Sequence, residues 1–438
     1  MNAEPSSATR TVFSGEVELA APFELPANPL ASSGAPYSDA RLLVRLGGEP
    51  IGFVDLPLGS DPLSQVRVVE EVHRELGARL AREIDRQGLT DSSTLDGLSP
   101  GAGSLLDPAA VFPATKVTVA VCTRNRAALL PACLEALRGL AHPELEFVIV
   151  DNAPADETTK AVIDRFAATD PRFVYCLEPA AGLSRGRNRA LAEASGEIIA
   201  FTDDDVRVDP SWVKALLRGF GRRDDVGCVT GMVASASLER PAEQYFDGRV
   251  WWSSRCDAQI YDAEDGPAGA SLHPYAAGSM GTGANFAVRV DLMRKLGGFD
   301  ECLGAGSPSG GGEDLDAFVR VIRSGWAIAY EPAALVWHVH RIDEAALRAQ
   351  MYEYGVALSA FLFKYISSRR SALDVMRRVP AGLAHLGVLG SRSRRVGADT
   401  GFDRGLMLAE MKGLGAGPWA YLRARRAQPR ARSRAVAP

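Results

Sequence analysis

The chain has 438 residues, of which 46% are hydrophobic and 24% charged, the proportions of a globular protein with two or three domains. Its formal net charge of −5 argues against a nucleic-acid-binding protein, which would carry an overall basic field. Six cysteines without a C-x-x-C pair suggest neither a disulfide framework nor a zinc site. No signal peptide or membrane span is recognisable, so we expect a cytoplasmic protein.

The first part of the chain predicts a small separate module. Residues 40–58 read as two short strands around a Gly-Gly turn. Residues 62–89 carry apolar side chains at helical spacing. We therefore predict an α+β module over 1–89, followed by a linker over 90–115 that is rich in Gly, Pro and Ser.

From residue 116 onward, apolar strands alternate with helices. The expected strands are 117–122, 146–150, 172–177 and 197–202, and the expected helices are about 127–140, 156–168 and 185–195. Strands that are apolar on both faces and alternate with helices predict a mostly parallel sheet with helices on both faces, an α/β fold. In such sheets, ligands bind at the carboxyl ends of the strands.

Three consecutive carboxylates, Asp203, Asp204 and Asp205, follow the last of these strands. Like charges repel one another, and moving them toward a core raises the cost further. A hard divalent cation among them would remove that cost, since carboxylates and phosphates are its preferred ligands. A solvated acidic loop or a helix N-cap is the alternative for an isolated triplet.

Six stretches in fixed order form a larger pattern around the triplet. They are "VCTRNR" (121–126), "VDNAPAD" (150–156), "GLSRGRNRAL" (182–191), "GTGANFAVRVDLMRKLGGFDECLG" (281–304), "GGEDLD" (311–316) and "EPAALVWHVHR" (331–341). Together with the triplet, they resemble the bacterial family 2 glycosyltransferases over about residues 116–345. The resemblance implies the GT-A fold, a Rossmann-like α/β fold that binds nucleotide sugars.

The resemblance also implies a metal site. Asp205 matches the metal ligand of the family, and Asp203 matches a ribose or nucleoside contact, while Asp204 is assigned to nucleotide-sugar binding without a settled role. His338 is a better match than His340 for a histidine that completes the metal shell. Mn²⁺ or Mg²⁺ is the implied cofactor, and an imidazole ligand suits Mn²⁺ better. Either histidine could instead end a strand without binding metal.

Further residues are assigned to the nucleotide sugar through the resemblance. They are Thr123, Arg124, Asp151, Arg187, Asn188, Gly283 and Asn285. Asp151 could accept a base proton, or it could be a loop cap. Arg187 and Asn188 could contact the base or phosphates, or lie on a basic helix face. Gly283 and Asn285 match the wall beside the donor sugar and the acceptor.

Glu313 and Asp314 match the Glu-Asp pair of the family. Transfer needs a base that takes the proton of the attacking hydroxyl. The resemblance assigns this role to Asp314, with inversion at the anomeric carbon, and assigns Glu313 to orienting the acceptor or the sugar. A helix N-terminus also stabilises carboxylates, so both acids could simply be first-turn residues.

The remainder predicts a helical region over 346–420 and a disordered Arg-rich tail over 421–438. Basic amphipathic helices can lie on an anionic membrane surface, which would place the protein peripherally at the inner face of the membrane. Packing on the catalytic domain or on a second copy is the alternative, and we favour it slightly.

The sequence thus predicts an inverting glycosyltransferase that moves a sugar from a UDP-, GDP- or dTDP-sugar to a hydroxyl acceptor by metal-assisted direct displacement. A catalytically inactive sugar- or nucleotide-binding protein is one alternative. A sugar-phosphate nucleotidyltransferase is another, but "CTRNRAA" stands where its Gly-rich loop would follow the first strand. The sequence identifies neither the sugar, the acceptor nor the oligomeric state.

Overall fold

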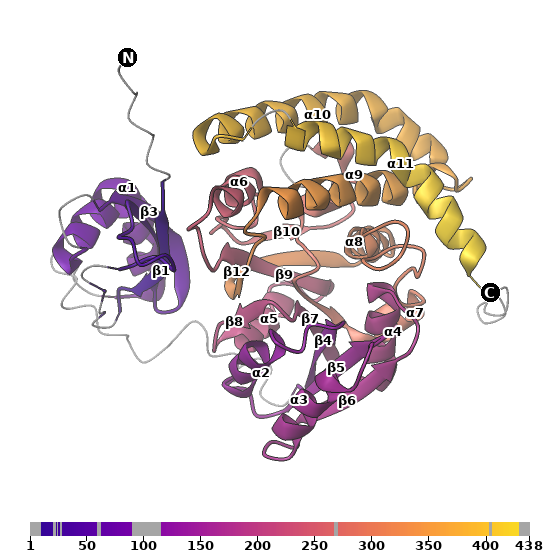
Figure 1. The fold of residues 1–438 in the computed structure, drawn as a ribbon, viewed down its shortest axis with the longest axis horizontal. Coiled ribbons are helices and arrows are strands. Elements are labelled where there is room, and N and C mark those ends of the chain that lie inside the picture. Colours follow the sequence, from indigo (N-terminus) through magenta and orange to yellow (C-terminus); the bar gives the residue numbers. More distant parts are fainter. Residues whose placement is uncertain are drawn as a thin grey trace.

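We analysed a computed structural model of the chain. It describes residues 10–428, except for 21–22, 24, 27–28, 59–62, 90–114, 267–269 and 403–404. The predicted linker over 90–115 therefore lies outside the described residues, apart from its last position. Figure 1 shows the N-terminal module beside a larger α/β body, with three long C-terminal helices stacked against that body.

The N-terminal module contains the predicted hairpin and helix, and one strand that the sequence analysis did not predict. Its elements are β1 (Val12–Glu18), β2 (Asp39–Leu46), β3 (Glu49–Pro57) and α1 (Gln65–Gln87). Gly47 and Gly48 form the hairpin turn with φ angles of 59° and 84°, which glycine adopts without steric cost. Ser64 caps α1 by accepting a hydrogen bond from the backbone N–H of Arg67, and Gly88 ends the helix in the left-handed conformation.

The module is joined to the body by buried ion pairs. Arg45 lies 2.6 Å from Asp209. Arg218 pairs with Glu49 of β3 and, at 2.5 Å, with Glu331, which is fully buried. Apolar side chains from both sides also pack together: Leu43 and Phe53 against Met232, Ala234, Leu335 and Trp337. The module is therefore part of the same packed structure as the body.

A nine-stranded sheet forms the body, in the order β10-β12-β9-β11-β7-β4-β5-β6, with β8 paired to β12. Its strands are β4 (Val117–Thr123), β5 (Leu145–Asn152), β6 (Phe173–Glu178), β7 (Ile198–Asp203), β8 (Val206–Val208), β9 (Val226–Ser235), β10 (Gln259–Tyr261), β11 (Asn285–Arg289) and β12 (Ala327–His338). The first four are parallel, whereas β11 runs antiparallel between β7 and β9. The predicted α/β fold with a mostly parallel sheet is confirmed.

Both faces of the sheet are covered, as the doubly apolar strands require. Along β4, Val117, Val119 and Val121 face one hydrophobic core, while Ala120 faces the other. The helices and 3-10 turns of the body are α2 (Leu130–Arg138), α3 (Thr158–Ala167), α4 (Leu183–Glu193), α5 (Trp212–Phe220), α6 (Pro241–Arg249), η3 (Ala270–Leu272), η4 (Ala277–Ser279), α7 (Val290–Lys295) and α8 (Glu313–Arg323).

The C-terminal region consists of three long helices, α9 (Glu344–Ile366), α10 (Ala372–Thr400) and α11 (Gly405–Ala427). Helix α11 lies against α9 so closely that a side chain at Gly413 would overlap the backbone of Tyr352. The disordered tail predicted from residue 421 is wrong for its first seven residues, because α11 continues to Ala427. In the part of the chain that the structure describes, no helix is both long and apolar enough to cross a membrane.

Candidate active site

The acid triplet stands where a central strand of the sheet ends. β7 lies between β4 and β11 and ends at Asp203, after which a turn leads into β8. In the parallel register, Thr123 lies opposite Asp151, and Cys122 lies opposite Asp203. The carboxyl ends of three neighbouring strands therefore place these polar side chains along one edge, where a ligand of an α/β sheet is expected.

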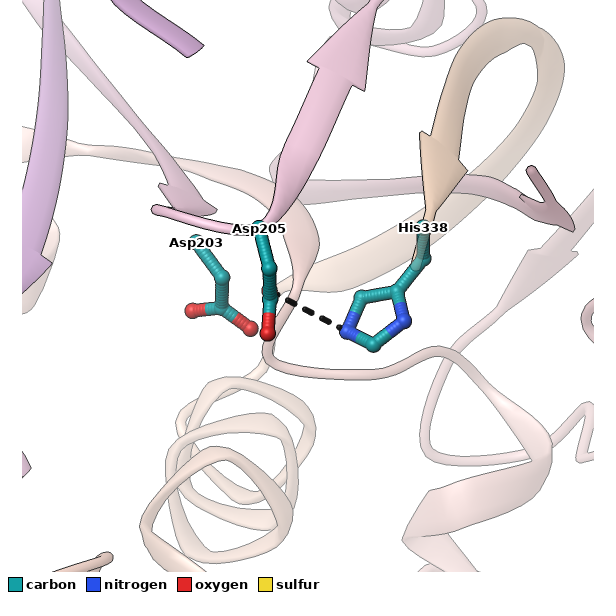
Figure 2. A group of neighbouring side chains, drawn as sticks. All are labelled: Asp203, Asp205 and His338. Carbon is teal, nitrogen blue, oxygen red and sulfur yellow. Dashed lines mark ion pairs between the residues drawn. The ribbon is translucent and has the colours of Figure 1, made fainter. Parts of the chain in front are cut away.

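His338 reaches the triplet because of how β8 pairs. The strand runs antiparallel to the end of β12, with Val206 opposite His338. Nε2 of His338 lies 3.3 Å from Oδ1 of Asp205. Figure 2 shows Asp203 beside this pair, and ligand atoms of the three residues lie within 4.8 Å of one another. Two carboxylates and an imidazole form a donor set that suits a divalent cation.

The electrostatics of this cluster reflect crowded acids. Burial raises the pKa of Asp203 to about 6, with Arg187 opposing the shift and Asp205 adding to it. Burial would also raise the pKa of Asp205, but His338 and Arg126 outweigh burial and bring it below its usual range. Burial lowers the pKa of His338, and Asp205 reverses this so that the net shift is upward. A cation among these groups would favour the ionised carboxylates.

Arg126 is a site residue that the sequence analysis missed. Its guanidinium lies 2.5 Å from Asp204 and 2.7 Å from Asp205. The hydroxyl of Thr123 donates to the other oxygen of Asp204 at 2.6 Å. Thr123 and Asp204 therefore have partners within the protein, and their predicted contacts with the nucleotide sugar stay predictions. The sequence contains only a weak indication of this role, because Arg126 is simply the second arginine of "TRNR" after the first strand.

His340 is not part of the carboxylate cluster. Its Nδ1 lies 3.1 Å from Nδ1 of His338, and its Nε2 lies 2.9 Å from Oγ of Ser235. The Ser235 hydroxyl in turn donates to Asp247 at 2.6 Å. Burial, reinforced by His338, lowers the pKa of His340 to about 3. Of the two histidines, the structure brings only His338 to the acids.

Glu313 and Asp314 begin α8 but point in different directions. Asp314 is half-buried, and its two oxygens accept from the backbone N–H groups of Gly283 at 2.7 Å and Leu315 at 2.8 Å. Glu313 is only 4% exposed and accepts from Arg187 at 2.8 Å. Burial raises the pKa of Glu313 to about 7, although Arg187 opposes the shift. Glu313 therefore has a partner inside the protein, and its predicted role in orienting the acceptor or the sugar stays a prediction.

Arg187 forms the centre of this arrangement. It is 2% exposed, donates to the carbonyl of Gly283 at 2.9 Å, and lies over three aromatic rings at 5.3–5.6 Å, those of Phe201, Phe286 and Phe299. A side chain at Gly283 would approach both Arg187 and Asp314 closely, at 2.9 and 3.1 Å. Arg187 thus supports the wall beside Asp314, and its predicted contact with base or phosphates stays a prediction.

Two predicted nucleotide-sugar residues, Asn285 and Asn188, make several hydrogen bonds within the protein. Asn285 is fully buried, accepts from Trp212 at 2.8 Å and donates to the carbonyls of Met232 and Ala334. Asn188 holds the backbone of Phe299 through one hydrogen bond in each direction. These side chains therefore join strands and loops, and their predicted contacts with the nucleotide sugar stay predictions.

Asp151 is a buried acid with one oxygen that is unpartnered in the described part of the chain, whereas Arg124 is exposed. Asp151 is fully buried, and its Oδ2 accepts from Tyr175 at 3.3 Å. Its Oδ1 has no hydrogen-bond partner among the described residues. Burial raises the pKa of Asp151, with the Tyr175 hydrogen bond opposing the shift. A buried acceptor without a partner is costly unless a ligand supplies the donor. Arg124 is exposed on the turn that follows β4.

Comparison with known proteins bears on the same region. Residues 118–280 match the model of the family described as "Glycosyl transferase family 2". The chain is 28% identical over 312 residues to a pre-mycofactocin glycosyltransferase of Mycobacterium tuberculosis, which covers 71% of this chain and 58% of that protein. It is 26% identical over 191 residues to a glucosyl-dolichyl phosphate glucuronosyltransferase of Haloferax volcanii, covering 43% and 57%.

Among solved structures, a mannosyltransferase of Pyrobaculum calidifontis in complex with GDP-Man and Mn²⁺ is similar, with a TM-score of 0.44 and 20% identity. This likeness covers 71% of the present chain and 86% of that one. The chain spans less than two thirds of the length of both curated relatives.

Proposed function

Because residues 118–280 match the model of glycosyl transferase family 2, we propose that this chain belongs to that family and transfers a glycosyl group from a nucleoside-diphosphate sugar to an acceptor hydroxyl. One observation carries the proposal: Asp203, Asp205 and His338 meet at the carboxyl edge of the sheet. There, a donor diphosphate would lie beside a cation, at the edge where α/β sheets bind ligands.

The nucleoside would bind at the ends of β4 and β5. The unpartnered Oδ1 of Asp151 would accept an N–H of the base, and exposed Arg124 would approach the phosphates. A thermal-shift panel of UDP, GDP and dTDP, each with and without Mn²⁺, would identify the base. A nucleotide at a hundred times its dissociation constant adds roughly 2.7 kcal/mol of stability.

Asp205 and His338, together with Asp203, would hold a divalent cation, Mn²⁺ or Mg²⁺. The donor set fits such an ion: the three side chains already converge, and burial raises the pKa of Asp203, so a cation beside it would favour its ionised form. When bound, the ion would neutralise charge on the departing diphosphate. Arg126 would keep Asp204 and Asp205 in place.

Asp314 would be the base of the reaction. Two backbone N–H groups hold its carboxylate at the start of α8, where the half-buried side chain remains accessible to an acceptor. It would take the proton as the hydroxyl oxygen attacks the anomeric carbon and the bond to the diphosphate breaks. Direct displacement of this kind inverts the anomeric centre, which NMR of the glycoside product would read.

The metal site gives a first prediction. Asp205→Asn should weaken Mn²⁺-dependent nucleotide binding about tenfold or more, roughly 1.4 kcal/mol, because one anionic ligand is lost. Isothermal titration of nucleotide with and without Mn²⁺ measures this. Asp225→Asn, on the surface before β9, is the matched control and should leave the titration unchanged. Identical curves for the Asp205 variant and the unmodified protein would refute the metal assignment.

We also propose that α11 contacts an anionic membrane surface. Its outward ridge carries Leu408, Met411 and Trp419, which are 55%, 54% and 72% exposed. From residue 411 to the end, the sequence has seven basic and no acidic residues. An apolar ridge continued by a basic end is complementary to anionic lipid headgroups.

Vesicle flotation tests this contact. Binding should occur with phosphatidylcholine vesicles containing about 30% phosphatidylglycerol and should largely disappear in about 0.5 M salt, which screens surface charge. Trp419→Ala should reduce binding, whereas Val66→Ala, at an exposed apolar residue on α1, should not. Equal binding to purely zwitterionic vesicles, or a concentration-dependent dimer lost in Trp419→Ala, would show that the ridge serves another purpose.

A further inference from the structure

A partly exposed aromatic side chain of α9 is connected to the histidines of the site through a row of rings. Tyr354 is 38% exposed. Its ring centroid lies 6.1 Å from that of Phe246, which lies 4.6 Å from the ring of His340. The ring of His340 in turn lies 4.9 Å from that of His338. One side of Tyr354 therefore faces the histidine end of the site.

The same part of α9 supports the segment that leads into α8. A Cβ at Gly311 would lie 3.1 Å from Cβ of Ala357, and one at Gly312 would lie 3.1 Å from the carbonyl oxygen of Ala357. Tyr354 and Ala357 are three positions apart and so share a face of the helix. Asp314 follows Gly312 by two positions, so Tyr354 stands between the His338 side of the site and the start of α8.

The charges that act on the tyrosine hydroxyl agree with this position. Partial burial raises the pKa of Tyr354 to about 12, while Gln350 and Arg249 oppose the shift and the charges of Asp314 and Asp203 add to it. The hydroxyl is therefore within electrostatic reach of both the proposed base and the acid triplet. These carboxylates would repel an anionic ligand at Tyr354 and favour a neutral one.

The exposed ring offers a surface that a sugar can use. Its neighbours Phe246, His340 and Ala357 are buried, so packing within this group leaves part of the Tyr354 ring uncovered. The side-chain amide of Gln350 donates to the Tyr354 hydroxyl at 3.4 Å and adds polar atoms at the edge of the ring. A tyrosine presents an apolar face and a polar tip, which match the C–H face and the hydroxyl rim of a sugar ring.

We propose that Tyr354 contacts the acceptor and that this acceptor is a neutral sugar, one ring of which lies against the tyrosine ring beside Asp314. This inference rests on the proposed function, and it names the class of acceptor that receives the glycosyl group. The contact would hold the acceptor hydroxyl next to the base, while the donor occupies the carboxyl edge of the sheet.

Glycosides of simple structure test the acceptor class. The full chain is supplied with Mn²⁺, the nucleotide-sugar donors and the methyl glycosides of glucose, galactose, mannose and N-acetylglucosamine. At least one glycoside should accelerate release of nucleoside diphosphate above the rate without acceptor. At the same concentration, 1-hexanol, which has a hydroxyl but no sugar ring, should not.

Three variants of α9 test the residue. Tyr354→Ala should raise the KM for the active glycoside on the order of tenfold without changing the donor KM, because a ring contact to the acceptor is lost. Tyr354→Phe keeps the ring and should keep a KM close to that of the unmodified protein. Tyr352→Ala is the matched control: Tyr352 is 41% exposed, but residues two positions apart do not share a helix face, so its KM should be unchanged.

An unchanged glycoside KM in folded Tyr354→Ala, an equal increase in Tyr354→Phe, or equal acceleration by 1-hexanol would overturn the proposal. Release that occurs without acceptor but that no glycoside accelerates would overturn it too, and would leave the proposed function standing.

If no donor releases nucleoside diphosphate, the proposed function fails, and binding then decides on Tyr354 by itself. Saturation-transfer NMR detects methyl glycosides bound to the protein without any turnover. Signals that are present with the unmodified protein and lost with Tyr354→Ala would support the contact, whereas equal or absent signals would refute it.

Discussion

Asp314→Asn should reduce the turnover number on the order of a hundredfold or more while leaving donor and Mn²⁺ binding nearly intact. A positioned carboxylate contributes roughly 10²–10⁴-fold by accepting a proton, and an amide cannot replace it. Asp314 lies on α8, outside the Asp203, Asp205 and His338 group, so the metal ligands are untouched. The loss should fall on kcat rather than on the donor KM, because the interaction belongs to the transition state.

Release of nucleoside diphosphate from candidate donors measures this effect. Asp291→Asn, at an exposed acid in the first turn of α7, is the control and should keep full turnover. An amide also has one acceptor where Asp314 uses two, so a thermal melt of the variant is needed to show that it is folded. Near-normal turnover in a folded Asp314→Asn protein would rule out Asp314 as the base.

Arg187→Met should destabilise the protein by about 3–5 kcal/mol, because removing one partner of a buried ion pair leaves the other uncompensated. Arg187 supports Glu313 and the carbonyl of Gly283, and it is itself only 2% exposed. Arg189→Met on the same helix breaks an exposed pair with Glu193 and should cost about 0–1 kcal/mol. Denaturant unfolding measures both.

The loss of folding stability caused by Arg187→Met should also increase with pH. Burial already raises the pKa of Glu313 to about 7 in the folded protein, and loss of the Arg187 charge raises it further. A carboxyl whose folded pKa is raised stabilises the protein at low pH and loses that contribution as pH rises toward the folded pKa. Between pH 7 and the new pKa, the difference between variant and parent should grow by about 1.4 kcal/mol per pH unit. A double variant with Glu313→Gln should abolish this slope; a slope that persists would place its origin elsewhere.

The parallel half of the sheet was predictable because its strands are apolar on both faces and alternate with helices. β11 was not, because an antiparallel strand inserted between β7 and β9 leaves no separate pattern in the sequence. β1 was missed for a related reason: it pairs in parallel with β2 across a long segment rich in Pro, Ala and Ser, so no tight hairpin turn links the two strands. Pairing between distant strands depends on tertiary packing, which local propensity does not contain.

Within the site, the approach of Asp205 and His338 followed from a family resemblance and the placement of both residues at strand ends. The orientation of neighbouring side chains did not follow. Charged and polar residues usually face solvent, so nothing in "SRGRNRAL" indicated that Arg187 would be buried and Asn188 would bind backbone. The burial of Asn285 was unpredictable for the same reason: its amide partners come from strands far away in the sequence.

The ion pairs between the N-terminal module and the body have a consequence for what counts as a unit of this protein. Glu49 shares Arg218 with the fully buried Glu331, and Leu43 covers Trp337. A partner that completes both a charge network and an apolar core resembles an obligate subunit more than an accessory domain. In this protein the N-terminal module is covalently attached to the body, so its effective concentration is high. The two parts therefore associate within one chain. Evolutionary selection on the residues of β12 therefore also depends on residues of the N-terminal module, which lie nearly three hundred positions earlier in the same chain.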